Sequence, residues 1–354
     1  MRALLCRDWR PFNDLEIVEI PDPIPPEKGL RIRVMAAGVS FAQSLVVQGK
    51  YQRKPPRPFT PGSEVAGIVE AVGSEASRFK VGDKVFAVID WGGLAEKAAA
   101  LEVNTYSIPE GLDFAKAISI TNSYGTSAAA LMWPNLLNVQ AGQTLLVHGA
   151  AGGVGIAAVE IGKILGAIVI ATASSNEKLE IAKSHGADHV INYSNTSFRD
   201  AVMDITNGFG VNACYDPVGG DVFTQSLRCM AVEGRIMPVG FAGGDIPQIP
   251  ANLLLVKNIT VTGLNMGYYM GWSPYDARYE SEERVRPIME KLAEWTVSGQ
   301  IRPEIVIICV SDQGPGIAHD DIPHVFDRFY RAPDMAKNTQ GAGLGLYLTR
   351  SIIE

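Results

Sequence analysis

The stretch that decides the fold is TLLVHGAAGGVGIAAVEIGKILGA, residues 144–167. Its start, TLLVHG, predicts a strand, and the residues after Gly153 predict a helix. The hexapeptide AAGGVG between them matches A-x-G-x-x-G, a relative of the dinucleotide-binding fingerprint. Glycines allow a tight turn close to a pyrophosphate, and the free amides at a helix start attract its charge. The stretch therefore predicts a dinucleotide site that includes Ala151, Gly152, Gly153 and Val154.

The same rhythm continues downstream, which favours a dinucleotide site over a plain glycine-rich turn. IVIATA precedes a helical stretch, NEKLEIAKSHGA, and HVINY precedes another, SFRDAVMDITNG; NACYD and GRIMPVG supply later strands. Strands joined by helix-length crossovers form a parallel sheet with helices on both faces. The sequence predicts a doubly wound Rossmann domain over residues 123–265 in an α/β protein.

The flanking segments have different patterns. Residues 1–122 alternate short β-branched runs, such as LRIRVMAAGVS and DKVFAVI, with Gly and Pro, which predicts a strand-rich domain. Residues 266–305 are predicted to be a return segment and an amphipathic helix. Its apolar residues recur at helical spacing: Val285, Ile288, Met289, Leu292 and Trp295.

Bulk properties exclude several classes of protein. A net charge of -7 over 354 residues disfavours a nucleic-acid partner, which needs a basic surface. The four cysteines lie far apart and show no paired ligand spacing, so we expect reduced thiols and a cytoplasmic protein. No apolar stretch is long enough for a membrane span, and the first twenty residues contain no secretory core.

The second predicted strand of the Rossmann domain bears on the choice of cofactor. NAD sites usually place a carboxylate about 20 residues beyond the glycines. Here the strand ends ATASSNEK, and Ser174, Ser175 and Lys178 offer hydroxyl donors and a cation that suit a 2′-phosphate. We therefore favour NADPH over NADH. The alternative is that the serines only cap the next helix and that Lys178 is a solvated charge.

Taken together in order, the motifs AAGVSFAQSLVVQGKY, PFTPGSEVAGIVEAVG, FKVGDKVFA, VHGAAGGVG, ATASSNEK, GADHVINY and DPVGGDVF are specific. From residue 1 to about residue 305 the chain resembles the zinc-independent, zeta-crystallin-like quinone oxidoreductases of the medium-chain dehydrogenase/reductase superfamily. The resemblance implies a GroES-like catalytic domain before the Rossmann domain. It also implies hydride transfer from NADPH to a quinone or an α,β-unsaturated carbonyl compound. A homodimer is expected through the edge strand NITVTGL, residues 258–264.

The resemblance also bears on metal chemistry. Zinc-dependent relatives place a Cys just after AAGV and a His in a G-H-E motif, whereas this chain has SFA at residues 40–42 and GSE at residues 62–64. We expect no metal. Alcohol oxidation without a Lewis acid is poorly supported. Reduction of an electron-poor acceptor needs less help, because the cofactor carries the hydride.

The resemblance assigns roles to individual residues. Tyr51 is expected to face the acceptor near the nicotinamide, and Ser40 stands where many relatives carry Asn, so these two are the catalytic candidates. Tyr51 could instead only pack against RKPPRPF. Glu64 and His148 are interpreted as structural, and no catalytic acid is identified. The remaining cofactor contacts implied are Thr126 at the phosphates, Lys178 and Tyr193 at the 2′-phosphate, and Gly240 and Phe241 beneath the nicotinamide.

From about Val306 the sequence changes character. DQGPGI, VFDRFYRA and GAGLGLYLTRSIIE resemble the glycine and F boxes of a sensor histidine kinase ATP-binding domain. The resemblance implies that Asp312 meets adenine and that Gly341, Gly343 and Gly345 lie under the phosphates. The upstream helix that bears the magnesium-binding asparagine is missing, so we expect residues 306–354 not to form an autonomous domain.

Three alternatives stay open at this point. The first is an enoyl-thioester reductase, which shares the hydride geometry. The second is an NADPH-binding protein whose turnover is impaired, because the foreign C-terminus replaces a segment that returns to the catalytic domain. An ATP-binding sensor kinase is the least favoured.

Overall fold

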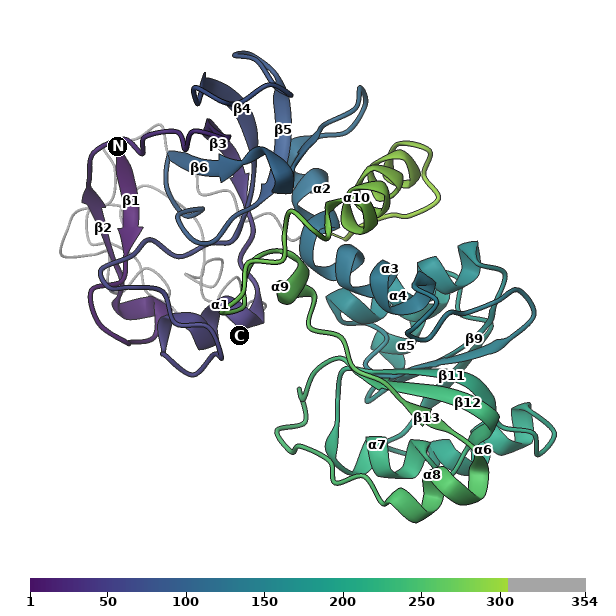
Figure 1. Ribbon diagram of the computed structural model, residues 1–354. Helices are drawn as coiled ribbons and strands as arrows, with labels where there is room; N and C mark the ends of the chain where they lie inside the picture. The colour runs from purple at the N-terminus through teal and green to yellow at the C-terminus, as the bar shows by residue number, and fades with distance from the viewer. Residues whose placement is uncertain (305–354) are drawn as a thin grey trace, which may run out of the picture. The chain divides into compact units, whose positions relative to one another are not determined.

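The computed structural model describes residues 1–304, in which a strand-rich part precedes a doubly wound part (Figure 1). The strands are β1 Arg2–Leu5, β2 Glu16–Glu19, β3 Gly29–Ala37, β4 Glu64–Val72, β5 Lys84–Val88, β6 Lys97–Leu101, β7 Thr105–Ser107, β8 Thr144–Val147, β9 Ile168–Ala173, β10 His189–Asn192, β11 Val211–Asp216, β12 Met230–Pro238 and β13 Thr260–Val261. The α-helices are α1 Phe41–Val47, α2 Phe114–Ser119, α3 Gly125–Met132, α4 Gly153–Ile164, α5 Asn176–Ser184, α6 Phe198–Ile205, α7 Gly220–Ser226, α8 Ala251–Lys257, α9 Met266–Tyr269 and α10 Glu282–Val297. Short 3-10 helices η1 Phe12–Asp14 and η2 Glu102–Asn104 and a π-helical turn η3 Ile120–Tyr124 complete the list.

The strand-rich part contains an antiparallel five-stranded sheet in the order β6-β3-β4-β5-β7 and a two-stranded sheet of β1 and β2. One face of the larger sheet is buried because apolar residues alternate along each strand, as with Leu30 and Ile32 in β3 and Val65 and Val69 in β4. The prediction of a strand-rich N-terminal domain is confirmed. Its predicted limit at residue 122 falls inside η3, and the domain limits stay predictions.

The doubly wound part contains a six-stranded parallel sheet in the order β10-β9-β8-β11-β12-β13. Counted along the chain from β8, this is the 3-2-1-4-5-6 order of a Rossmann domain, with the change of direction between β8 and β11. The predicted doubly wound sheet is confirmed.

Both faces of this sheet are covered. Leu145 and Val147 of β8 point into the core beneath α3, α4 and α5, whereas Leu146 between them points into a second core beneath α6, α7 and α8 (Figure 1). Successive side chains point to opposite faces, and both faces are buried. For this reason residues 145–147 of β8 are all apolar, rather than only every second one. Helices therefore lie on both faces of the sheet.

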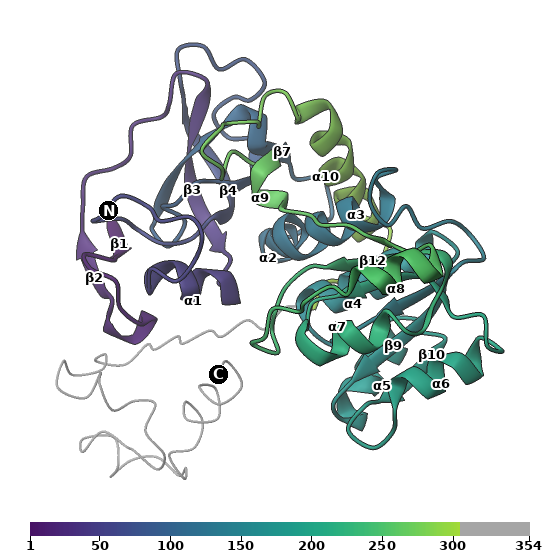
Figure 2. The ribbon, with the colours of Figure 1, turned by 60° about the horizontal axis from the view of Figure 1, so that its bottom comes forward.

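Helix α10 packs beside α3 and η3 (Figure 2). All five apolar residues predicted for its packed face are buried. Its Arg286 reaches the strand-rich part, where Nη1 donates to the Thr105 carbonyl at 3.0 Å and Nη2 to the Glu102 carbonyl at 3.0 Å. The helix thus holds the two parts together. Within residues 1–304, no helix combines the length and the apolar character that a membrane span requires.

Candidate active site

The predicted dinucleotide turn lies between β8 and α4. A Cβ atom on Gly155 would come within 2.2 Å of the Gly149 carbonyl oxygen, so only glycine fits where the helix crosses the strand. Gly152 and Gly153 are exposed, and Ala151 and Val154 are half-buried. The turn therefore offers open backbone at the start of a twelve-residue helix, which is the cradle that a pyrophosphate requires.

The residues predicted to contact the adenosine end lie together at the carboxyl ends of β9 and β10. Ser174 directly follows β9, its carbonyl accepts a hydrogen bond from the Ser194 hydroxyl at 2.9 Å, and Tyr193 directly follows β10. Ser175 caps α5 by accepting from the Lys178 amide at 3.4 Å. Ser175 therefore caps α5, as the alternative interpretation of the serines expected. The exposed Lys178 side chain lies in the first turn of the same helix.

The remaining predicted cofactor contacts lie on either side of the turn. Thr126 is half-buried in α3, and its neighbour Ser127 donates to the Val154 carbonyl of the turn at 3.0 Å. Gly240 and Phe241 follow β12 in a loop that packs on the loop after β11, where the Ala242 amide donates to the Pro217 carbonyl at 3.0 Å. These residues fit a nicotinamide dinucleotide laid across the change of direction in the sheet.

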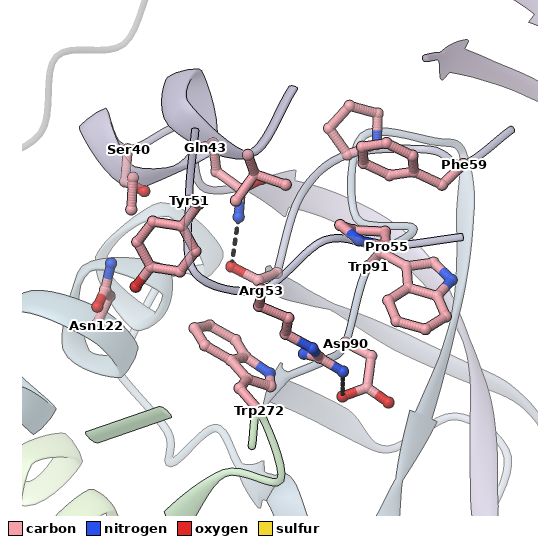
Figure 3. A pocket seen from close by; sticks show the side chains of 14 residues that line it. Ser40, Gln43, Tyr51, Arg53, Pro55, Phe59, Asp90, Trp91, Asn122 and Trp272 are labelled. Atoms are coloured by element: carbon pink, nitrogen blue, oxygen red, sulfur yellow. Dashed lines mark hydrogen bonds and ion pairs between the residues drawn. The ribbon is translucent and has the colours of Figure 1, made fainter. Parts of the chain in front are cut away.

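A separate pocket lies in the strand-rich part, beside the π-helical turn (Figure 3). Ser40, Tyr51 and Asn122 lie together at one side of it, so the two predicted catalytic residues share one cavity. The Ser40 hydroxyl is buried and has no hydrogen-bond partner within residues 1–304. Burial raises the pKa of Tyr51 above its usual value, so its hydroxyl stays protonated at neutral pH.

The π-helical turn connects this pocket with the dinucleotide turn. Asn122 lines the pocket, and the next residue, Ser123, has its hydroxyl 3.0 Å from the position that a Cβ atom on Gly153 would occupy. Such single π-turns recur at functional sites because they change the direction of consecutive side chains. Here consecutive residues face the two halves of one candidate site.

Several pocket residues were missed by the sequence prediction. Gln43 lies one helical turn after Ser40 and donates through Nε2 to the Ser63 hydroxyl at 2.7 Å. Arg53 lies two residues after Tyr51 in extended chain. A spacing of three residues on a helix, or of two in an extended segment, puts side chains on the same side, so Gln43 and Arg53 could have been predicted from Ser40 and Tyr51. Trp272 comes from the return segment more than 200 residues away, and no local pattern indicates it.

The two residues interpreted as structural are buried. His148 is held at both ring nitrogens, by the Thr172 hydroxyl at 2.8 Å and the Ser226 hydroxyl at 2.7 Å, and burial lowers its pKa to about 3. It is a neutral core residue, as predicted. Glu64 is also buried, and burial raises its pKa to about 7, against the opposing effect of hydrogen bonds from Thr121 and Asn122.

Metal ligands do not gather anywhere in residues 1–304, where no three His, Cys, Asp or Glu side chains form a cluster that could hold an ion. Ser40 and Ser63 both line the pocket, at the positions where the zinc-dependent proteins carry their ligands. Hydroxyl groups of serine are weak zinc ligands compared with thiolate and imidazole. The expectation of a metal-free site stays a prediction.

Comparison with known proteins gives consistent matches. The model of the alcohol dehydrogenase GroES-like domain matches residues 26–123, and that of the zinc-binding dehydrogenase family matches residues 153–281. Quinone oxidoreductase-like protein 2 of Rattus norvegicus is 42% identical over 270 residues, 76% of this chain and 76% of the relative. Quinone oxidoreductase of Homo sapiens is 37% identical over 227 residues, 64% of this chain and 68% of the relative.

Solved structures share the fold. Quinone oxidoreductase of Pseudomonas syringae pv. Tomato DC3000 superposes with a TM-score of 0.76 at 29% identity, over 85% of this chain and 90% of that one. Quinone oxidoreductase of Escherichia coli, solved in complex with NADPH, gives a TM-score of 0.75 at 25% identity, over 86% of this chain and 91% of that one. The pairing of a GroES-like domain with a Rossmann domain is confirmed.

A third family model, that of the histidine kinase-, DNA gyrase B- and HSP90-like ATPases, matches residues 283–354. The kinase-like boxes noted in the sequence lie outside the described residues. The match also takes in residues 283–304, which include most of α10. That helix is packed against the oxidoreductase part of the chain.

Proposed function

The chain belongs to the quinone oxidoreductase family of the medium-chain dehydrogenases/reductases, and from this premise we propose that it uses NADPH to reduce a quinone or an α,β-unsaturated carbonyl compound. When bound, the cofactor supplies the hydride. The residues proposed to hold it are the open glycines of the turn, Thr126, the Ser174 to Lys178 segment with Tyr193, and the loop at Gly240 and Phe241. A cytoplasmic homodimer is part of the same proposal.

The observation that carries this proposal is the junction at η3. Asn122 lines the pocket while Ser123 lies against the glycine turn, which supports an arrangement in which an acceptor in the pocket would lie next to a dinucleotide on the turn. Ser40, Tyr51 and Asn122 are neutral hydrogen-bond donors on the acceptor side. They suit the oxygen of a carbonyl group, on which negative charge develops as hydride adds to the conjugated system.

The residues of the pocket favour positioning over acid catalysis. Tyr51 keeps its proton because burial raises its pKa, so it donates a hydrogen bond to the acceptor oxygen without releasing the proton readily. The Ser40 hydroxyl has no competing partner within residues 1–304 and can donate in the same way. We propose that water delivers the final proton.

A test is NADPH oxidation by the purified protein against quinones, enones and enoyl thioesters, with a cofactor-binding titration in parallel. Turnover with quinones or simple enones supports the proposal. Turnover confined to enoyl thioesters would replace it with the enoyl-thioester alternative. Tight NADPH binding without any turnover would favour the protein with impaired turnover, and absence of binding would reject the proposal altogether.

A Tyr51→Phe, Ser40→Ala double variant tests the assigned roles. It is expected to lower kcat by tenfold or more, because two of the three proposed donors to the acceptor oxygen are lost, while NADPH affinity stays the same. A loss of NADPH affinity without a change in kcat would place these residues on the cofactor rather than the acceptor.

A further inference from the structure

The pocket holds a cation that reduction of a neutral carbonyl does not require. Arg53 lies on the pocket wall between Trp91 and Trp272, with its guanidinium carbon 5.2 Å and 5.8 Å from the two ring centres (Figure 3). Its Nη2 donates to Asp90 Oδ1 at 2.9 Å. Stacking and the ion pair together fix the plane of the guanidinium group.

Two N–H donors in this wall are left unused. Arg53 Nη1 and Trp272 Nε1 are both buried, and neither has a hydrogen-bond partner within residues 1–304. Buried donors without an acceptor carry a desolvation cost, so their presence at a pocket wall points to a ligand that supplies oxygen atoms. A carboxylate supplies two oxygens, one for each donor.

The charges around Arg53 favour an anion over a second neutral carbonyl. Asp90 Oδ1 also accepts from Arg278 Nη2 at 3.1 Å, so one carboxylate serves two guanidinium groups. Arg278 is further paired with Asp276, which leaves Arg53 as the less compensated cation. The chain segment over residues 50–57 contains no acid and adds Lys50 and Lys54, together with Arg57, which is paired with Asp8 at 3.4 Å. The whole chain, by contrast, has a net charge of -7.

We propose that the pocket takes conjugated carbonyl acceptors that carry a carboxylate, which Arg53 binds at the end of the pocket away from Ser40 and Tyr51. This inference rests on the proposed function and names its substrate class. Arg53 is then the specificity-determining residue: the neutral donors hold the reacting carbonyl, and Arg53 fixes the other end of the molecule.

The test compares trans-4-oxopent-2-enoate with its methyl ester, since the two share the enone and differ in the charge. The acid is expected to be reduced with a kcat/KM at least tenfold above that of the ester. Arg53→Gln should remove at least tenfold from the acid and less than threefold from the ester. Arg53→Lys should restore part of the preference because it keeps the charge but not the planar group.

Lys54→Gln is the matched control. It removes a cation one residue away whose side chain is not among those that line the pocket, and it should change the ratio of acid to ester by less than twofold. If Lys54→Gln and Arg53→Gln lowered the ratio of acid to ester equally, the preference for the acid would come from the overall positive charge of residues 50–57. That result would overturn the proposed contact with Arg53. Equal kcat/KM for acid and ester in the unmodified protein would overturn it as well.

A binding measurement separates this inference from the proposed function. Saturated 4-oxopentanoate lacks the conjugated double bond, and NADP⁺ carries no hydride to transfer. Its affinity relative to that of its methyl ester is therefore measured, without turnover, by quenching of tryptophan fluorescence in the presence of NADP⁺. Preferential binding of the acid that is lost in Arg53→Gln supports the site even if no acceptor is reduced. Preferential binding that survives Arg53→Gln with an unchanged thermal midpoint would sink it.

Discussion

Lys178 is the residue on which the proposed choice of NADPH depends. It lies exposed in the first turn of α5, beyond the strand end where an NAD site would place a carboxylate. Lys178→Ala is expected to weaken NADPH binding by roughly tenfold to a hundredfold, because a charge-assisted hydrogen bond of about 1.5–3 kcal/mol is lost. NADH binding should stay within about twofold.

Calorimetric titration with each cofactor measures the difference in affinity between NADPH and NADH, in the unmodified protein and in Lys178→Ala. Lys183→Ala, in the last turn of the same helix, is the control for the loss of a lysine from α5. Equal affinities of the unmodified protein for NADPH and NADH would show that the 2′-phosphate is not recognised at all. Ser175 would then only cap α5, and Lys178 would be a solvated charge.

Glu64 gives the stability of the fold a pH dependence. Burial raises its pKa in the folded state to about 7, whereas an unfolded glutamate keeps its usual value near 4.5. The folded state therefore holds the proton more tightly, and the stability contributed by protonated Glu64 is fully present below pH 4.5 and is lost as the pH rises through 7. Above pH 7 the side chain is a buried carboxylate, and no cationic partner for it is found in residues 1–304.

Glu64→Gln removes this titration while it keeps hydrogen-bonding groups for Thr121 and Asn122. At pH 8 the variant should be more stable than the unmodified protein by roughly 3 kcal/mol at most, and the difference should vanish near pH 4.5. Denaturant unfolding at a series of pH values measures it, with the exposed Glu16→Gln as control. Parallel stability curves for Glu64→Gln and the unmodified protein would contradict the prediction.

At the scale of the element, β13 is one of the two edge strands of the Rossmann sheet, the other being β10, and within residues 1–304 it pairs only with β12. Thr260 is exposed there, and the neighbouring α8 exposes Leu255 and Val256, at 78% and 73%. An edge strand beside exposed apolar residues invites pairing with a second copy, whereas a charged side chain on the edge blocks it. Thr260→Lys is therefore expected to convert the proposed homodimer into a monomer.

Analytical ultracentrifugation measures this change over a range of concentrations. Phe209→Lys, which places a lysine on another exposed apolar residue, is the control and should leave the assembly intact. A monomer in the unmodified protein would reject the homodimer, and a dimer that survives Thr260→Lys would place the interface elsewhere.

The elements that sequence predicts well are those whose pattern is local. The strand, glycine turn and helix around Gly155 are set by neighbouring residues, and so is the packed face of α10. The proposed acceptor pocket could be predicted only in part, because Ser40 and Tyr51 lie near each other in sequence while Trp272 reaches the same pocket from the return segment. The direction of Asn122 depends on a π-turn, for which the sequence carries no clear signal.

At the scale of the whole molecule, one chain carries matches to two unrelated families, and the second match begins inside α10. The ATPase model begins at residue 283, yet Leu292 and Met289 of that helix are fully buried in the oxidoreductase core. Further along, the Arg302 amide donates to the buried Glu160 carboxylate at 3.0 Å. The oxidoreductase part therefore holds the chain as far as residue 304, and those residues cannot also complete an ATP-binding domain.

Because residues 283–304 pack in the oxidoreductase part, we predict that the protein does not hydrolyse ATP or phosphorylate itself through residues 306–354. Glycine boxes supply backbone amides, but magnesium requires oxygen ligands from an upstream helix, and the upstream residues belong to the oxidoreductase. Replacing residues 306–354 with the ending of a quinone oxidoreductase should raise the thermal midpoint and NADPH turnover, as the resemblance to that family implies. Both are measured on the two chains side by side, together with phosphate release from magnesium-ATP. Phosphate release that Asp312→Ala abolishes would show a working ATP site, and a replacement that alters neither stability nor turnover would show that residues 306–354 impose no cost on the oxidoreductase.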